Sequence, residues 1–170
     1  MIDRVRDIDA VLLRRARQLA TRAHDQGAVA TEELVTFSVG PHQLGIPMTW
    51  VSHAATIRHL TEVPGGPPWL VGVTTVEGQL VSLLELSVLL GLSQRGVRDA
   101  TSSLVVASNG RQIGVAAEQI FGIEDVPRSA IAQLPSADGP LTRIASLPAR
   151  QLLLLDVPTL FGDPRLGGRR

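Results

Sequence analysis

Four pairs of short apolar segments, each pair joined by a brief turn, constrain the fold of this chain more than any other feature. Apolar residues in these segments recur at every second position or run together for a few residues, as they do in β-strands. Two of the turns contain Glu77-Gly78 and Asn109-Gly110, where glycine supplies the positive φ that a two-residue hairpin needs. The other two turns lie near Pro41-His42-Gln43 and at Ala149. The sequence therefore predicts four hairpins in an all-β barrel or sandwich.

Other segments add strands and short helices to this pattern. "ATIRHLTEV" (residues 55–63) and "QIFGIEDV" (119–126) are candidate strands, which brings the expected number to about ten. Short helices are expected in "ELSVLLGL" (85–92) and "DVPTLFG" (156–162), because each follows an apolar strand and contains a terminating glycine. Since both halves of the chain end in this way, the sequence favours two similar small β-barrels with a few short helices.

The first 27 residues have the periodicity of a helix instead. Apolar residues spaced three and four apart form one stripe, and they are Val5, Ile8, Leu12, Ala16, Leu19 and Ala23. Aspartates lie early and arginines late, as a helix dipole favours. The sequence predicts an N-terminal amphipathic helix over 1–27, a β domain over 33–163 and a flexible tail over 164–170. In one interpretation the stripe packs against the body of the protein; in the other it binds a partner helix or a second copy.

The composition argues against nucleic-acid binding and thiol chemistry. Sixteen arginines balance sixteen acidic residues, and the chain has no lysine and no cysteine. Aromatic residues make up 3% of the chain, whereas surfaces for single strands need stacking aromatics within a basic groove. Phe37, Phe121 and Phe161 occupy inward positions of the expected strands and helix, so we assign them to the core.

No arrangement of residues suggests catalysis, a metal or a cofactor. The histidines, His24, His42, His53 and His59, do not have metal-binding spacing. Glu124 and Asp125 are neighbours on a strand and therefore point to opposite faces. The longest apolar run, residues 151–157, is too short to span a bilayer. These observations predict a cytoplasmic binding module that is not an enzyme.

The order of the motifs resembles the CheW family, the adaptors that couple chemoreceptors to a histidine kinase in bacterial chemotaxis-type signalling. Residues 34–51 resemble the opening hairpin that leads to a key valine, here Val51. Residues 60–92 resemble the central signature of a proline loop, Gly-Val, a turn ending in Gly, an apolar strand and a short helix. Residues 103–126 and 151–162 resemble the second half of the family's domain.

The resemblance implies two five-stranded β-barrel subdomains that share a core. It also implies two partners, the regulatory domain of a CheA-type histidine kinase and the cytoplasmic tip of a chemoreceptor held in a groove between the subdomains. Other CheW-like proteins or a second copy of this chain are further implied partners. The expected location is cytoplasmic, with recruitment to membrane-associated receptor arrays but no direct membrane insertion. An alternative is an orphan interaction module of the same fold that serves no chemotaxis kinase.

The resemblance also assigns the partner-binding residues, which are Val51, Gly72, Thr75, Val76, Glu77 and Gly78. The family's turn usually reads Asn-Leu-Arg-Gly, so Glu77 replaces an arginine by the opposite charge. Family members usually have Glu-Ile where this chain has His53-Ala54, and Val-Pro where it has Val81-Ser82. Because like charges at an interface cost several kcal/mol, roughly, these departures predict a divergent member with altered partners.

Overall fold

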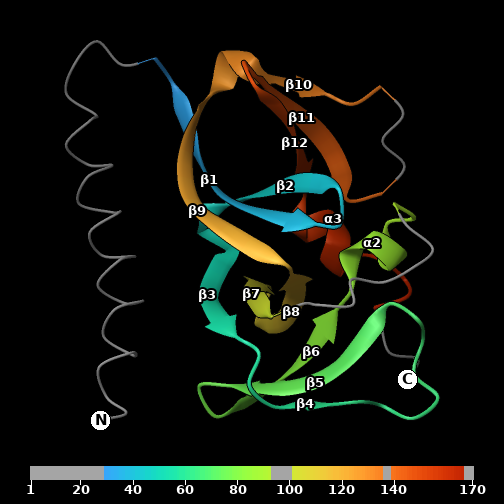
Figure 1. The fold of residues 1–170 in the computed structure, drawn as a ribbon. Coiled ribbons are helices and arrows are strands. Elements are labelled where there is room, and N and C mark those ends of the chain that lie inside the picture. Colours follow the sequence, from blue (N-terminus) through green and yellow to red (C-terminus); the bar gives the residue numbers. More distant parts are fainter. Residues whose placement is uncertain (1–28, 93–100, 136–138, 167–170) are drawn as a thin grey trace, which may run out of the picture.

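The computed structural model describes residues 29–92, 101–135 and 139–166 (Figure 1). The expected N-terminal helix over 1–27 and residues 167–170 of the expected tail lie outside the described residues. The described part of the chain contains twelve strands and only short helical segments, which confirms the all-β expectation.

The strands form two six-stranded sheets. Sheet A contains, in spatial order, β10 (Ile131–Gln133), β11 (Leu141–Leu147), β12 (Arg150–Leu155), β2 (His42–Pro47), β1 (Thr31–Val39) and β9 (Gln119–Pro127). Sheet B contains β3 (Val51–Thr56), β7 (Ser102–Ser108), β8 (Arg111–Ala117), β6 (Gln79–Leu84), β5 (Leu70–Val76) and β4 (Leu60–Thr61). The resemblance implied five strands in each; the shortest of the twelve, β4 and β10, have two and three residues.

Two short α-helices follow equivalent strands of the two sheets. Helix α2 (Leu86–Leu89) follows β6 and helix α3 (Val157–Phe161) follows β12, both within the segments predicted as helical. Single turns of 3-10 helix, η2 (Met48–Trp50) and η3 (Arg128–Ala130), lead into β3 and β10. The acidic residue before each α-helix caps it, because the Glu85 side chain accepts from the Ser87 amide and the Asp156 side chain from the Thr159 amide.

All four predicted hairpins are present as antiparallel pairs: β1–β2, β5–β6, β7–β8 and β11–β12. The two glycine-containing turns adopt the same conformation, with φ of 48° and 80° at Glu77-Gly78 and 51° and 75° at Asn109-Gly110. Two successive positive φ values are typical of the type I′ turn, whose twist matches that of the strands it joins.

Each sheet is curled until its two edges approach each other. In sheet B the edge strands β3 and β4 are joined by three residues only, Ile57–His59. In sheet A the edge strands β9 and β10 are joined by the three residues of η3. Because four backbone steps span at most about 14 Å, opposite edges must lie close together. The described residues contain no hydrogen-bonded ladder between these edges, so each subdomain is a barrel-like curl rather than a closed barrel.

One predicted strand is wrong. Residues 55–63 were expected as one strand, but β3 ends at Thr56 and β4 covers only Leu60–Thr61 at the opposite edge of sheet B. The connecting backbone makes its hydrogen bonds outside the β3–β7 and β4–β5 ladders. The Ile57 amide donates to the Thr101 carbonyl oxygen, and the His59 carbonyl oxygen accepts from the Thr74 hydroxyl. These bonds let the chain cross from one edge to the other.

The two halves of the chain share one topology and exchange hairpins. Strands β1–β6 with α2 correspond in order to β7–β12 with α3, and each half ends in a hairpin followed by its helix. The hairpin β1–β2 belongs to the sheet of the second half, and β7–β8 to the sheet of the first half. Parallel pairs join the halves at Leu154–Gly45 and Leu83–Gly114. Each subdomain is therefore built from both halves.

The main hydrophobic core lies between the two sheets and is shared by them. Its buried members include Val35 and Leu44 of sheet A and Leu104 and Val115 of sheet B, together with residues of both α-helices. A smaller cluster fills the curl of sheet A, and its members are Leu34, Val126, Ala145, Leu152 and Leu154. The shared core that the resemblance implied is thus confirmed.

The placement of Phe121 in the core is wrong, because its side chain is 43% exposed. Thr36 pairs with Gly122 and Phe37 with Ile120, so Phe121 is the extra residue of a β-bulge in β9. A bulged residue leaves the alternation of the strand, which turns this ring outward.

Contacts at the C-terminal end of the described chain reach Leu166, past the expected domain boundary at 163. Leu166 packs against the main core, and its carbonyl oxygen accepts a hydrogen bond from the Arg111 guanidinium at 3.0 Å. The same guanidinium lies 5.6 Å from the centre of the Phe161 ring, which places a cation over the aromatic face.

Candidate functional site

The tip of the β5–β6 hairpin carries four of the six residues assigned to partner binding. Thr75 and Glu77 are exposed and Val76 is half-buried. Glu77 occupies the left-handed region at φ 48°, which costs an ordinary L-residue about 1–2 kcal/mol relative to a right-handed conformation. The backbone conformation at this position does not favour a glutamate, so the presence of Glu77 points to a role for its carboxylate.

The Glu77 carboxylate pairs with His53 of strand β3. The distance between His53 Nε2 and Glu77 Oε2 is 2.8 Å, and the two side chains are 35% and 70% exposed. The other ring nitrogen, Nδ1 of His53, is buried and has no hydrogen-bond partner among the described residues. The contact joins the hairpin tip to an edge strand of the same sheet, which is possible because sheet B is curled.

The contact brings together two of the positions at which this sequence departs from the CheW pattern. The resemblance implies Glu at position 53 and Arg at position 77, whereas this chain has His53 and Glu77. The structure shows the acid on the hairpin and the base on the strand, the opposite of the order of residues that the resemblance implies. An exposed pair of this kind contributes only about 0–1 kcal/mol to stability. Its larger effect is on the charge that the surface presents.

An apolar groove lies beside this pair, between the two sheets. Its volume is about 210 Å³, and it is lined by Val35, Met48, Val51, Ser52, His53, Ala54, Leu104, Ile120, Gly122 and Ile123. Val51, the first residue of β3, is half-buried and packs against the main core while lining the groove. The groove thus joins Val51 of the predicted site to the hairpin tip through His53.

Gly72 stands apart from the other predicted site residues because it is buried beneath strand β4. A Cβ atom on Gly72 would lie 2.5 Å from the Thr61 carbonyl oxygen and 2.9 Å from Leu60 Cδ1. The residue sits at a register shift in the β5–β6 pairing, where the backbone of β4 approaches closely. The structure gives Gly72 a packing role and no side chain that could face a partner.

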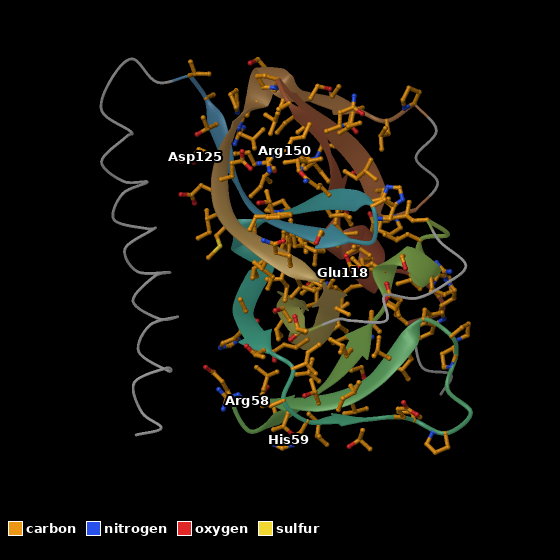
Figure 2. The ribbon with its side chains drawn as sticks, in the orientation of Figure 1. Arg58, His59, Glu118, Asp125 and Arg150 are labelled. Atoms are coloured by element: carbon orange, nitrogen blue, oxygen red, sulfur yellow. The ribbon has the colours of Figure 1, made fainter. Side chains whose placement is uncertain are left out.

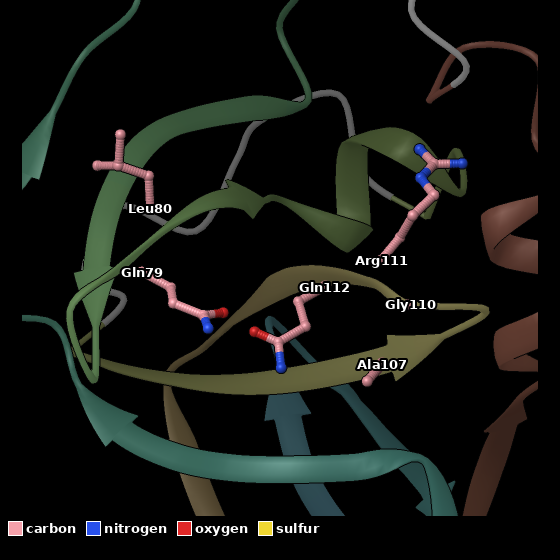
Figure 3. A pocket seen from close by; sticks show the side chains of 6 residues that line it. All are labelled: Gln79, Leu80, Ala107, Gly110, Arg111 and Gln112. Carbon is pink, nitrogen blue, oxygen red and sulfur yellow. The ribbon is translucent and has the colours of Figure 1, made fainter.

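A second, more polar depression lies next to the hairpin, and Figure 3 shows its lining side chains. It is formed by Gln79, Leu80, Ala107, Gly110, Arg111 and Gln112. The amide groups of Gln79 and Gln112 point toward each other across it, whereas Arg111 points away from it. Leu80 is 80% exposed, the highest value among the exposed large apolar side chains of the described residues. We add Leu80 to the exposed surface of this hairpin.

Sequence reasoning placed Val51 and the hairpin tip in the predicted site and implied a groove between the subdomains. It did not predict which residues line the groove or that His53 pairs with Glu77. These two residues are 24 positions apart, one on β3 and the other in the β5–β6 turn, and β3 is not hydrogen-bonded to β5 or β6. Their simultaneous departure from the pattern that the resemblance implies, with an acid replaced at one position and an acid introduced at the other, was the one signal that could have linked them. Leu80 could have been found from its alternation, since its neighbours Val81 and Gln79 are expected on the opposite face.

The described residues bear on the sequence-based expectations for metal sites, the acidic pair of β9 and membrane-spanning segments. The described ranges contain no group of three or more His, Asp or Glu side chains placed to hold a metal ion. Glu124 forms an ion pair with Arg150, while Asp125 is exposed on the other face of β9, as the alternation of the strand predicted. None of the described helices has the length and apolar character needed to cross a membrane.

Comparison with known proteins gives one consistent family. The sequence model of the CheW-like domain matches residues 33–165. The chain is 24% identical over 155 residues to the chemotaxis protein CheW of Klebsiella aerogenes, covering 87% of this chain and 92% of that protein. It is 28% identical over 137 residues to the protein PilI of Pseudomonas aeruginosa, covering 79% and 75%. It is 27% identical over 119 residues to the protein FrzA of Myxococcus xanthus, covering 70% and 71%.

A solved structure has the same fold. The crystal structure of the scaffolding protein TtCheW from Thermoanaerobacter tengcongensis superimposes with a TM-score of 0.66 at 16% sequence identity. The match covers 74% of this chain and 89% of that one. The chain therefore belongs to the CheW-like domain family, whose members are scaffold and adaptor proteins rather than enzymes.

Proposed function

We propose that this protein is a non-catalytic adaptor that couples chemoreceptors to a CheA-type histidine kinase in a chemotaxis-like two-component system, with altered partner specificity. Membership of the CheW-like domain family supports the adaptor role. The curled subdomains present an edge strand, a hairpin tip and an apolar groove on one connected surface. We assign partner contact to this surface, with Val51, Thr75, Val76, Glu77 and Gly78 in contact and Gly72 supporting the hairpin from beneath.

The contact of Glu77 with His53, which places the acid on the hairpin tip, is the observation that supports the altered specificity. Because Glu77 is 70% exposed, its carboxylate reaches a docked partner even while it contacts His53. A partner that offers an acidic group to the arginine of the usual turn would meet a like charge here. We infer that the partner of this chain presents a basic or neutral group at that position. The proposed location of this protein is the cytoplasm, with recruitment to membrane-associated receptor arrays.

Charge-exchange variants test this proposal. The double change His53→Glu with Glu77→Arg restores the usual polarity, and each single change serves as its control. We expect the double variant to bind a CheA-type regulatory domain and receptor tip of ordinary sequence about tenfold more tightly than the natural chain does. Thermal unfolding should be nearly unchanged, because an exposed ion pair contributes little to stability. Equal affinity of the natural chain and the double variant would overturn the altered specificity.

The alternative of an orphan interaction module is tested separately. Reconstitution with the kinase and receptors of the same organism should give a ternary complex in which this chain changes kinase activity. Binding to one partner with no effect on phosphorylation would support the orphan module instead.

A further inference from the structure

The groove between the sheets continues into an acidic patch on sheet A. Val35 of β1 lies opposite Ile123 of β9, and both line the groove. Two residues farther along each ladder, Glu33 lies opposite Asp125. Since alternate residues of a strand share one face, the acidic pair and the groove lie on the same side of the sheet. Figure 2 shows Asp125 on the outer side of β9.

The acidic pair lacks a balancing cation in the described part of the chain. Glu33 and Asp125 are both exposed, and neither forms an ion pair with a described residue. Like charges directly opposite each other on an antiparallel ladder are destabilising. The neighbouring acids are paired by contrast, Glu32 with Arg143 and Glu124 with Arg150. The arrangement fits a basic, partly apolar segment that covers this face.

The segment that precedes β1 is long enough to cover this face, and it joins the described chain beside it. The described chain begins at Val29, and the Ala30 carbonyl oxygen accepts a hydrogen bond from Arg128, which fixes the entry into β1 beside β9. From Val29 to the groove residue Val35 an extended chain covers about 20 Å. The helix that the spacing predicts over residues 3–24 would be about 30 Å long. A helix that turns back along β1 therefore reaches past the acidic pair to the groove.

The charge pattern of that segment matches the patch. Residues 10–24 contain four arginines and no acidic residue. At about 100° per residue, Arg15 and Arg22 fall about 60° and 80° from the centre of the apolar stripe, on the same side of it. Arg14 and Arg17 fall on the far side of the helix by the same count. Arg15 and Arg22 would thus lie along one border of the stripe. They belong to the half of the helix that is nearer in sequence to β1, and so to Glu33 and Asp125.

We propose that residues 3–24 of this chain dock along the groove between the two sheets. The apolar stripe covers Val35 and Ile123 and extends toward β3, and Arg15 and Arg22 lie beside Glu33 and Asp125. Docking does not depend on the proposed adaptor function. Its consequence does: the segment occupies the face that a partner helix would use, so the partner must displace it.

Disulfide trapping in the full chain tests the docking, since the natural chain has no cysteine to interfere. A cysteine at Ala54, which is exposed and lines the groove, is combined in turn with a cysteine at Val5, Ile8 or Leu12. Matched controls carry the second cysteine at Arg14 or Arg17. We expect rapid intramolecular cross-links for stripe positions and slow ones for the controls. Cross-linked dimers would show a second copy in the groove, and equal rates at all positions would show no docking; either outcome overturns the proposal.

Hydrogen exchange provides a test that does not depend on introduced cysteines. The double variant Arg15→Glu with Arg22→Glu places like charges beside the acidic patch, and Arg14→Glu with Arg17→Glu changes the net charge equally. We expect exchange within residues 3–24 to speed up about tenfold in the first variant and hardly at all in the second. Adding Glu33→Arg and Asp125→Arg to the first variant should restore protection. Equal effects of the two variants would contradict the docking, whatever partners the protein binds.

Discussion

At the scale of single residues, the backbone conformation of Glu77 lowers the stability of the fold, whereas its contact with His53 raises it slightly. The equivalent turn of the β7–β8 hairpin has Asn109 in the same left-handed conformation, which asparagine adopts readily. Glu77 keeps a strained backbone and gains one exposed ion pair. This combination is expected where a side chain is retained for what it contacts rather than for stability.

The change Glu77→Asn should therefore stabilise the protein. Relief of the left-handed strain outweighs the loss of an exposed ion pair, so we expect a gain of about 0.5–1 kcal/mol in the free energy of unfolding. The reciprocal change Asn109→Glu is the matched control and should destabilise by a similar amount. Urea denaturation of the two variants measures both effects. A loss of stability in Glu77→Asn would mean that the His53 contact stabilises the protein by more than the left-handed strain at Glu77 destabilises it.

A second residue-scale prediction concerns acid stability. Two hydrogen bonds from Arg143, at 2.8 and 2.9 Å, hold the pKa of Glu32 below its usual range, although partial burial opposes the shift. The unfolded chain then binds a proton at higher pH than the folded chain does. The stabilising effect is complete above the unfolded pKa and is lost as the pH falls through the folded one.

We therefore expect Glu32→Gln to flatten the fall in unfolding free energy between about pH 5 and pH 3. The change Glu62→Gln serves as control, because Glu62 is exposed and forms no ion pair with a described residue. Chemical denaturation at a series of pH values gives the slopes. An unchanged slope in Glu32→Gln would show that the pair does not carry the acid dependence.

At the scale of elements, the sequence predicted what neighbouring residues determine and missed what distant contacts determine. Turn residues and alternation located all four hairpins and both short α-helices. The break at Ile57–His59 and the bulge at Phe121 were not predictable, because each is set by pairing with strands far along the chain. The resemblance implied a groove between the subdomains, but its lining residues were not predictable either, since they come together only where β3 meets β1 and β9.

Gly72 illustrates the same distinction and gives an element-scale prediction. Gly72→Ala should destabilise by about 1–3 kcal/mol, because its methyl group would meet the Thr61 carbonyl oxygen and force β4 away from β5. Thr75→Ala, at an exposed position of the same strand, should leave stability nearly unchanged. Thermal unfolding of both variants measures the difference. Normal stability in Gly72→Ala would remove the packing role and leave direct partner contact as its function.

At the scale of the whole molecule, the exchanged hairpins make the two subdomains mutually dependent. The parallel partners of β2 and β6 are β12 and β8, and both belong to the second half of the chain. A first half on its own would therefore lack both pairings. The main core also draws side chains from both halves. The apolar groove and the hairpin tip are therefore positioned by contacts that neither half can make alone.

Interlaced halves should unfold together. We expect the emission of Trp50 and Trp69, both packed against the main core, and far-UV circular dichroism to report one coincident urea transition. Chain fragments 1–95 and 96–170 should each remain unfolded alone and recover the signal of the full chain when mixed, because each supplies a hairpin to the other's sheet. Two separate transitions, or a folded single fragment, would show that the subdomains are independent. In that case binding at the groove could be lost without loss of the hairpin surface, which the interlaced topology does not allow.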